Sequence, residues 1–200
     1  ASRREIIAIA GANGAGKSTL ARMLCGLQKN GSGTVLWAGK PMSRRLRRKK
    51  AYMVMQDVGH QLFTDSVAAE CALGIKAPNK DEIDRTLEKV DLLAYKERHP
   101  LSLSGGQMQR LAVVVSDICG KELLVFDEPT SGLDRKSMEE VGTLTRSLAT
   151  QGKVILIITH DIEFMMRICT RILFIRDGEI VEDLSGGQKE KIVRLLRGEE

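Results

Sequence analysis

Short runs of apolar residues, each followed by glycine, acidic or other polar residues, divide the chain at intervals. Most of these runs are apolar throughout rather than alternating with polar positions, which is typical of strands buried on both faces of a parallel sheet. The strands that this pattern predicts cover residues 5–10, 33–38, 51–55, 122–127, 153–158 and 171–176.

Between the predicted strands, apolar residues recur with the spacing of amphipathic helices. A turn at Asp177-Gly178 precedes the last of these segments. The predicted helices cover residues 17–27, 134–150, 161–169 and 187–197, together with a largely helical stretch from about 65 to 119. Strands that alternate with helices predict an α/β protein with a parallel core, which here carries a helical insertion.

The composition agrees with one globular unit. With 200 residues, 42% of them hydrophobic, the chain can bury a single core and a small subdomain. No run of about 18 apolar residues occurs, so the sequence predicts no membrane span. The cysteines lie far apart without a C-x-x-C pair, which disfavours zinc or a disulfide framework and predicts reduced, buried thiols. They are Cys25, Cys71, Cys119 and Cys169.

The net charge of +5 has one clear local source, because six of the seven residues from Arg44 to Lys50 are cationic. Such a run can contact nucleic acid or lipid headgroups. No aromatic residues lie between these cations to stack bases. We therefore interpret the run as a solvated turn between two strands, with proximity to lipid as the main alternative.

The clearest chemical motif directly follows the first predicted strand. Residues Gly11–Ser18 fit the phosphate-loop pattern G-x-x-x-x-G-K-[ST]. The glycines let backbone N–H groups face phosphate oxygens, and the helix that opens near Lys17 adds its positive end. Lys17 offers a charge to the outer phosphates, and the hydroxyls of Ser18 and Thr19 suit Mg²⁺. The residues predicted to bind a nucleoside triphosphate are Gly11, Asn13, Gly14, Ala15, Gly16, Lys17, Ser18 and Thr19.

A second pair of motifs narrows the class of NTPase. The apolar run that ends in Asp127 and Glu128 predicts a buried strand with two carboxylates at its carboxyl end, where open α/β sheets bind ligands. Shortly before it stands the pentapeptide LSGGQ of Leu103–Gln107. With these residues the chain resembles the ATP-binding cassette (ABC) ATPases, whose signature is LSGGQ and whose second Walker motif ends in Asp-Glu. The resemblance covers essentially the whole chain and implies a P-loop NTPase (RecA-like) fold.

The other motifs of that family follow in the expected order. Gln56, after the third predicted strand, matches the Q-loop glutamine, and Ser131–Asp134 matches the D-loop. His160, after another apolar strand, matches the switch histidine that senses the γ-phosphate. His60 and His99 match no motif, and we interpret them as ordinary residues.

The resemblance implies a role for each motif residue, with ATP and Mg²⁺ as cofactors. Glu128 would polarise the attacking water, and Lys17 with His160 would stabilise charge on the transferred phosphoryl group. Ser18, Gln56 and Asp127 would hold Mg²⁺ directly or through water. The remaining residues would complete the nucleotide site between two ABC ATPase domains, identical or paralogous. These are Ser104, Gly105, Gly106, Gln107 and Asp134.

The signature pentapeptide occurs a second time, from Leu184 to Gln188. A working signature needs a following helix and then a strand that ends in carboxylates, but only 12 residues remain after Gln188. The first copy continues with MQR, as the family pattern does, whereas the second continues with KEK. We interpret the second copy as a coincidence.

The segment after Gln56 indicates a branch of the family. The run QLFTDSV of Gln61–Val67, with Glu70 after it, resembles the ATPases of energy-coupling factor importers, although Asp57-Val58 departs from their pattern. The resemblance implies that this segment receives helices of an integral membrane coupling subunit at the cytoplasmic face of the membrane. A separate membrane protein would capture a vitamin or metal ion, and the ATPase would have no direct contact with it.

Three alternatives stay open. Leu62, Phe63 and Val67 can simply be core residues of the helical insertion. The chain can belong to another ABC transporter branch, exporters included. It can also be a soluble ABC ATPase that acts on nucleic acid or ribosomes, although the short insertion and the single cassette make nucleic acid an unfavoured partner.

We expect one ABC ATPase domain over residues 1–200, with a helical subdomain at about 57–119 between the Q-loop and the signature, and a small antiparallel β subdomain. The family holds adenine against an aromatic side chain upstream of the phosphate loop, but none of the ten residues before Gly11 is aromatic. We therefore expect the antiparallel subdomain to be truncated at its N-terminus. Discrimination between ATP and GTP should then be poor.

Overall fold

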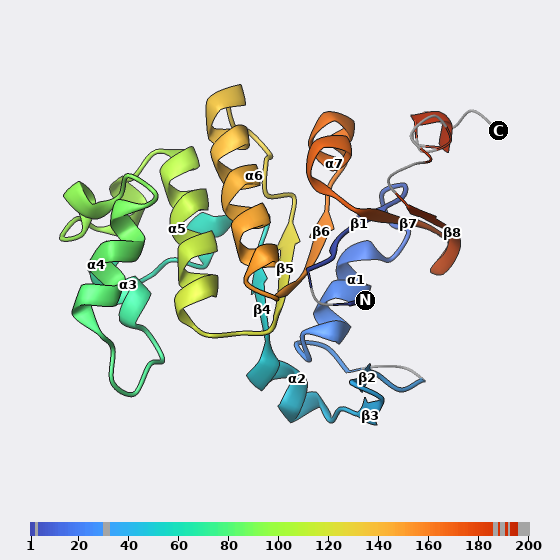
Figure 1. The fold of residues 1–200 in the computed structure, drawn as a ribbon, viewed down its shortest axis with the longest axis horizontal. Coiled ribbons are helices and arrows are strands. Elements are labelled where there is room, and N and C mark those ends of the chain that lie inside the picture. Colours follow the sequence, from blue (N-terminus) through green and yellow to red (C-terminus); the bar gives the residue numbers. More distant parts are fainter. Residues whose placement is uncertain (3, 30–32, 186–187, 189–190, 192, 196–200) are drawn as a thin grey trace.

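The computed structural model describes residues 1–2, 4–29, 33–185, 188, 191 and 193–195. Its main strands are β1 (Ile6–Ala10), β4 (Ala51–Val54), β5 (Leu123–Asp127), β6 (Val154–Ile158), β7 (Arg171–Arg176) and β8 (Glu179–Ser185). They form one sheet in the order β4-β5-β6-β1-β7-β8 (Figure 1). The first five strands are parallel, and β8 pairs antiparallel with β7. The predicted α/β class with a parallel core is confirmed.

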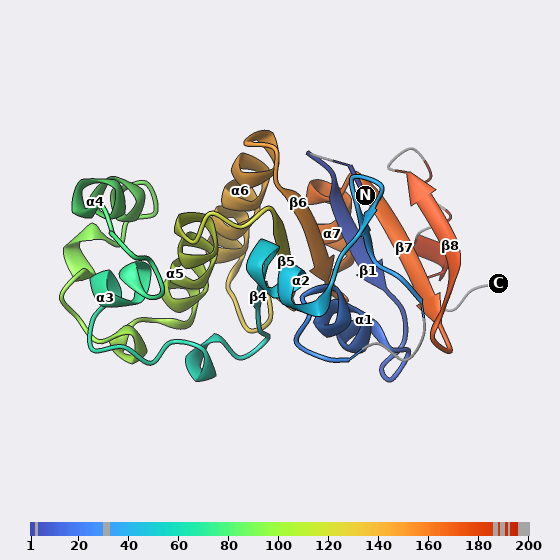
Figure 2. The same cartoon turned by 90° about the horizontal axis from the view of Figure 1, so that it is seen from below.

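Helices cover both faces of this sheet. They are α1 (Lys17–Leu24), α5 (Gly105–Ile118), α6 (Arg135–Thr150) and α7 (Ile162–Ile168). Helix α1 lies on one face, and α5, α6 and α7 lie on the other (Figure 2). Neighbouring residues of a strand point to opposite faces, so Ile155 and Ile157 pack in the core beneath α6, while Leu156 and Ile158 pack in the core beneath α1. A strand buried on both faces therefore has to be apolar throughout.

A helical unit beside the sheet fills most of the sequence between β4 and β5. Its shorter elements are η1 (Val58–His60), α3 (Val67–Ala72), α4 (Lys80–Glu88), η2 (Leu93–Tyr95) and η3 (Pro100–Ser102). They have a core of their own, in which Leu62, Leu87 and Leu92 pack with Leu111 of α5. The structure thus confirms the largely helical stretch predicted from about 65 to 119.

The basic run is a helix, so the prediction of a turn there is wrong. Helix α2 (Arg44–Lys50) begins after Ser43, whose hydroxyl caps its first turn. The guanidinium of Arg44 donates to the carbonyl oxygens of Gly26 at 2.8 Å and Leu27 at 3.1 Å, just beyond the end of α1. This cap and this tertiary anchor stabilise a helix that a count of charges does not reveal.

Two strand predictions also need correction. The strand expected over 33–38 is reduced to β2 (Leu36–Trp37), which pairs with β3 (Lys40–Pro41) in an antiparallel hairpin. This pair is the small antiparallel part that was expected. Strand β8 was not predicted, because most of its residues are exposed at the edge of the sheet and leave no apolar run in the sequence.

The second LSGGQ sequence begins at the end of β8. Leu184 is buried and Ser185 is the last strand residue, while Gly186 and Gly187 lie outside the described residues. The first copy stands instead at the start of α5. Most of the final helix predicted over 187–197 lies outside the described residues. Within that range, residues 191 and 193–195 are described as helical.

Candidate functional site

A polar cavity of about 430 Å³ lies at the edge of the sheet where the parallel strands end. Four segments far apart in the sequence meet there: the loop after β1 and the residues that follow β4, β5 and β6. They meet because parallel strands present their carboxyl ends at one edge of a sheet. The lining residues are Asn13, Gly14, Gly16, Lys17, Ser18, Thr19, Gln56, Asp127, Glu128, Ile158 and His160.

The phosphate loop connects β1 with α1 and depends on glycine. Gly11, Gly14 and Gly16 have φ angles of 145°, 83° and 99°, which L side chains rarely adopt. A Cβ at Gly11 would lie 2.1 Å from the carbonyl oxygen of Ile175 in β7. The loop backbone therefore approaches β7 too closely for a side chain at Gly11.

The turn between β7 and β8 supports the phosphate loop from the side. The Gly178 N–H donates to the carbonyl oxygen of Ala15 at 3.1 Å. Asp177 and Gly178 both have positive φ, at 51° and 83°, as this tight turn requires. The sequence predicted the turn but not this contact, because local residue pattern does not tell which distant loop a turn meets.

Lys17 is held in the cavity by the loop itself. Its Nζ donates to the carbonyl oxygens of Gly11 at 2.8 Å and Ala12 at 2.9 Å, and the residue is only 7% exposed. Burial lowers the pKa of Lys17, and the negative charges of Glu128 and Asp127 oppose that shift. An ammonium group in this position attracts the anionic oxygens of a phosphate chain.

Asp127 and Ser18 form the candidate metal position. Burial raises the pKa of Asp127, opposed by a hydrogen bond from Ser18 and by the charges of Arg22 and Lys17. One carboxylate, one hydroxyl and the Gln56 amide oxygen in one cavity fit Mg²⁺, which takes few protein ligands and completes its shell with phosphate and water. No cluster of three or more His, Cys, Asp or Glu suited to a metal occurs among the described residues, and a Mg²⁺ site of this kind needs none.

The side chains of Glu128 and His160 meet at the wall of the cavity. His160 Nε2 lies 3.2 Å from Glu128 Oε1, and the side chains are 53% and 15% exposed. Oε1 of Glu128 is buried and accepts no well-aligned hydrogen bond from the described residues. The backbone of Glu128 has a φ of 48°, unusual for a residue with a side chain. A buried acceptor oxygen beside the phosphate loop is suited to take a proton from water.

The signature residues lie outside this cavity, at the start of α5. The Ser104 N–H donates to Gln107 Oε1 at 2.9 Å, and Ser104 Oγ accepts the Gln107 N–H at 3.3 Å, so the two residues form a capping box. A Cβ at Gly106 would lie 2.4 Å from Ser137 Oγ of α6, whereas a Cβ at Gly105 would have nothing within 4 Å. Packing within the chain thus explains Gly106 but not Gly105.

Asp134 of the predicted D-loop caps α6. Its Oδ1 accepts the Ser137 N–H at 2.7 Å, and this hydrogen bond lowers the pKa of Asp134. The structure therefore brings the loop, Gln56, Asp127, Glu128 and His160 together in the phosphate cavity, which the D-loop and signature residues do not line. A separate cavity beside it contains Gln56 together with Gly105 of the signature and Ser131–Leu133 of the D-loop.

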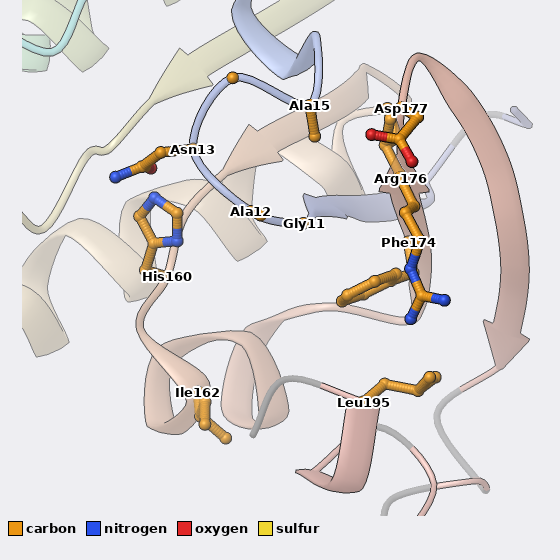
Figure 3. Close-up of a pocket in the computed structure, with 12 residues that line it drawn as sticks. Gly11, Ala12, Asn13, Ala15, His160, Ile162, Phe174, Arg176, Asp177 and Leu195 are labelled. Carbon is orange, nitrogen blue, oxygen red and sulfur yellow. The ribbon is translucent and has the colours of Figure 1, made fainter. Parts of the chain in front are cut away.

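A second cavity, of about 740 Å³, lies on the other side of the phosphate loop (Figure 3). Asn13 and His160 line both cavities. Figure 3 shows Phe174, Ile162 and Leu195 around the apolar part of this hollow. Sequence analysis did not assign these residues, because their only signal was an apolar pattern shared by every buried element.

Two further side chains that sequence analysis left without a role hold the segment after β4. Gln61 Nε2 donates to a carbonyl oxygen of β4 at 2.8 Å, and its Oε1 accepts the Met55 N–H at 3.0 Å. Glu70, only 2% exposed, accepts the N–H groups of Phe63 at 3.1 Å and Thr64 at 3.0 Å. The motif Gln61–Val67 with Glu70 was the available signal, and sequence analysis used it to indicate a branch of the family but not these contacts.

The family model described as ABC transporter matches residues 1–131, well over half of the chain. The chain belongs to the ABC transporter family. An ABC transporter ATP-binding protein of Treponema denticola is 58% identical over 192 residues, which are 96% of this chain and 39% of that relative. Another, of Streptomyces avermitilis, is 37% identical over 195 residues, which are 93% of this chain and 73% of the relative.

A solved structure agrees with this assignment. CbiO1 from Clostridium perfringens, part of the ABC transporter complex CbiONQ, is 30% identical with a TM-score of 0.83, over 98% of this chain and 83% of that one. The predicted fold class and the ATPase activity of this ABC domain are thereby confirmed. In the described part of the ABC domain, every helix is too short or too polar to cross a membrane.

Proposed function

We propose that this ABC ATPase powers import of a vitamin or metal ion through a transporter of the energy-coupling factor type. Phe63 carries the proposal. It is 69% exposed, whereas Leu62 and Val67 of the same motif are 2% and 0% exposed. A protein that used the motif only for its core would not turn this ring to solvent. The similarity to CbiO1, itself part of a transporter complex, supports the same branch.

In the proposed reaction the phosphate loop binds the phosphates of ATP, and Lys17 balances their charge. Mg²⁺, when bound through Ser18, Asp127 and Gln56, supplies a further positive charge for the phosphate oxygens. Glu128 accepts a proton from the attacking water, and His160 stabilises the charge that develops on the γ-phosphate. The protein contributes position and electrostatic field, and forms no covalent bond to the nucleotide.

We propose an integral membrane coupling subunit as the partner of the surface around Phe63. Glu70 restrains the backbone on which Phe63 stands, so little conformational entropy is lost when the ring is buried by a partner. The segment also begins directly after Gln56, which lines the phosphate cavity. A helix docked here would therefore lie next to the residue best placed to sense the nucleotide.

The pair Leu62 and Phe63 provides a matched test of this surface. Phe63→Ala should weaken association with the coupling subunit by about 30-fold, the loss expected for an aromatic anchor worth about 2 kcal/mol, and leave the melting temperature nearly unchanged. Leu62→Ala should instead lower the melting temperature, since removing a buried leucine costs about 2–5 kcal/mol. Melting curves of both purified variants and the amount of membrane subunit that co-purifies with each decide the matter. If Phe63→Ala still co-purified with the membrane subunit but had a much lower melting temperature, Phe63 would be a core residue and not a docking residue.

The import function itself is tested by purifying a tagged copy from membranes and reconstituting what accompanies it. An integral membrane complex that takes up a vitamin or metal ion only with hydrolysable ATP supports the proposal. A complex that moves its substrate outward, or one that contains ribosomes and no membrane protein, contradicts it.

We further propose that a second ABC ATPase domain, identical or paralogous, completes the nucleotide site. The placement of Ser104 and Gly105 outside the phosphate cavity supports this arrangement. Glu128→Gln should sediment as a dimer with ATP and Mg²⁺ and as a monomer without them, because blocked hydrolysis keeps the nucleotide between the two domains. Adding Gly105→Leu should abolish the dimer but not the fold, since space is open at Gly105. A monomer under all conditions, alone and with candidate paralogues, would contradict the proposal.

A further inference from the structure

The positive charge of the chain is concentrated in one segment. Ten of the 31 lysines and arginines lie between Ile6 and Gln56, where no Asp or Glu occurs. The other 149 residues contain 21 cations and 26 anions. A slightly acidic body therefore carries a strongly basic segment, and the net charge of +5 hides this division.

Part of the charge in α2 has a structural purpose. Arg44 is anchored on main-chain carbonyls, and Arg47 is buried, with 3% exposed. Lys50 pairs with Glu122 and lies over the ring of Trp37, 5.2 Å from its centroid. These three cations attach α2 to the rest of the fold and to the β2–β3 hairpin.

The other cations of α2 do not attach the helix to the rest of the described fold in this way. Arg45, Arg48 and Lys49 are exposed, and their side chains form no hydrogen bond or ion pair with the part of the chain that the structure describes. Lys40 of the neighbouring hairpin is exposed as well. Maintaining this many uncompensated cations on neighbouring positions costs electrostatic repulsion, which an anionic partner would relieve.

Exposed leucines accompany these cations. Leu36 of β2 is 58% exposed and Leu46 of α2 is 38% exposed. The contact between Lys50 and Trp37 joins the two elements, and Figure 1 shows them together along the lower edge of the molecule. We call this area the basic surface. It consists of Leu36, Lys40, Arg45, Leu46, Arg48 and Lys49.

The basic surface is separate from the nucleotide site. Helix α2 leads directly into the amino end of β4, whereas the phosphate cavity lies at the carboxyl ends of the parallel strands. A ligand at the basic surface would therefore not compete with ATP.

We propose that the basic surface binds the anionic headgroups of a lipid bilayer. Clustered cations attract anionic lipid, and exposed leucines beside them reach the boundary of the acyl chains. Single-stranded nucleic acid would need open aromatic faces on which to stack, but Trp37 of the neighbouring hairpin has the Lys50 ammonium over its ring. The arrangement thus matches a membrane surface better than a nucleic acid.

Co-sedimentation of the full chain with vesicles tests this proposal. The vesicles contain phosphatidylcholine with about 30% phosphatidylglycerol, or phosphatidylcholine alone as the neutral arm. The chain should bind the anionic vesicles only. Changing Arg45, Arg48 and Lys49 together to Gln should weaken that binding on the order of 100-fold, and raised salt should weaken it as well.

A matched control removes the same charge elsewhere. Changing Lys76, Lys80 and Lys89 to Gln also removes three exposed cations, but from the helical unit, and should leave vesicle binding within about twofold of the parent chain. Circular dichroism shows whether both triple variants fold. If the α2 variant does not fold, Arg45→Glu is measured in its place.

Several outcomes would overturn the proposal. These are equal binding to neutral vesicles, no binding to anionic ones, or equal loss of binding in both triple variants. Duplex DNA and RNA of matched charge are assayed beside the vesicles. Binding to either that exceeds binding to the vesicles, and that is lost in the α2 variant, would assign the surface to nucleic acid instead.

Discussion

Glu128→Gln should lower the rate of ATP turnover by roughly 10²–10⁴-fold while leaving ATP binding intact. The amide keeps the size of the side chain but cannot accept a proton at the position where the carboxylate oxygen Oε1 now lies beside His160. Lys17 and the glycines of the phosphate loop are untouched, so the contacts that hold the phosphates should persist.

Steady-state turnover and nucleotide titration of the same preparation measure the two effects separately. Glu88→Gln makes the same chemical change at an exposed position of α4 and should turn over ATP at the parent rate. Unchanged turnover in Glu128→Gln would remove Glu128 from the catalytic role. Lost binding together with lost turnover would show that the residue supports the fold of the site instead.

Lys17→Ala should weaken ATP binding by about 10²-fold, because hydrogen bonds to charged groups are worth about 1.5–3 kcal/mol and the ammonium can make more than one. The change also leaves the carbonyl oxygens of Gly11 and Ala12 without the donor that now holds them. The loop should therefore lose both its charge and part of its shape.

Calorimetric titration with ATP measures this loss, and a melting curve shows whether the fold survives. Lys80→Ala removes one positive charge from an exposed position of α4 and should bind ATP as the parent chain does. Comparable affinity in Lys17→Ala and Lys80→Ala would mean that the loop backbone alone binds the phosphates. Together with Glu128→Gln, this variant separates binding from turnover within one cavity.

Strands and motifs that depend only on neighbouring residues could be predicted from the sequence. The strand Ile6–Ala10 is apolar at every position because both of its faces are covered, and the phosphate loop is one contiguous pattern. The edge strand Glu179–Ser185 escaped prediction because its exposed residues leave no apolar run. Helix Arg44–Lys50 escaped prediction because it depends on an anchor at Gly26, which lies 18 positions from Arg44.

The sequence by itself determined the chemistry: which residues can cradle phosphate, accept a proton or hold a metal, since these depend on residue type and short spacing. Only the tertiary structure decided which of them meet. It joined Lys17, Asp127 and His160 in one cavity, because parallel strands end at a common edge, and it kept Ser104 apart. It also buried Leu62 but exposed its neighbour Phe63, a difference set by packing against distant residues that neighbouring positions in a sequence do not record.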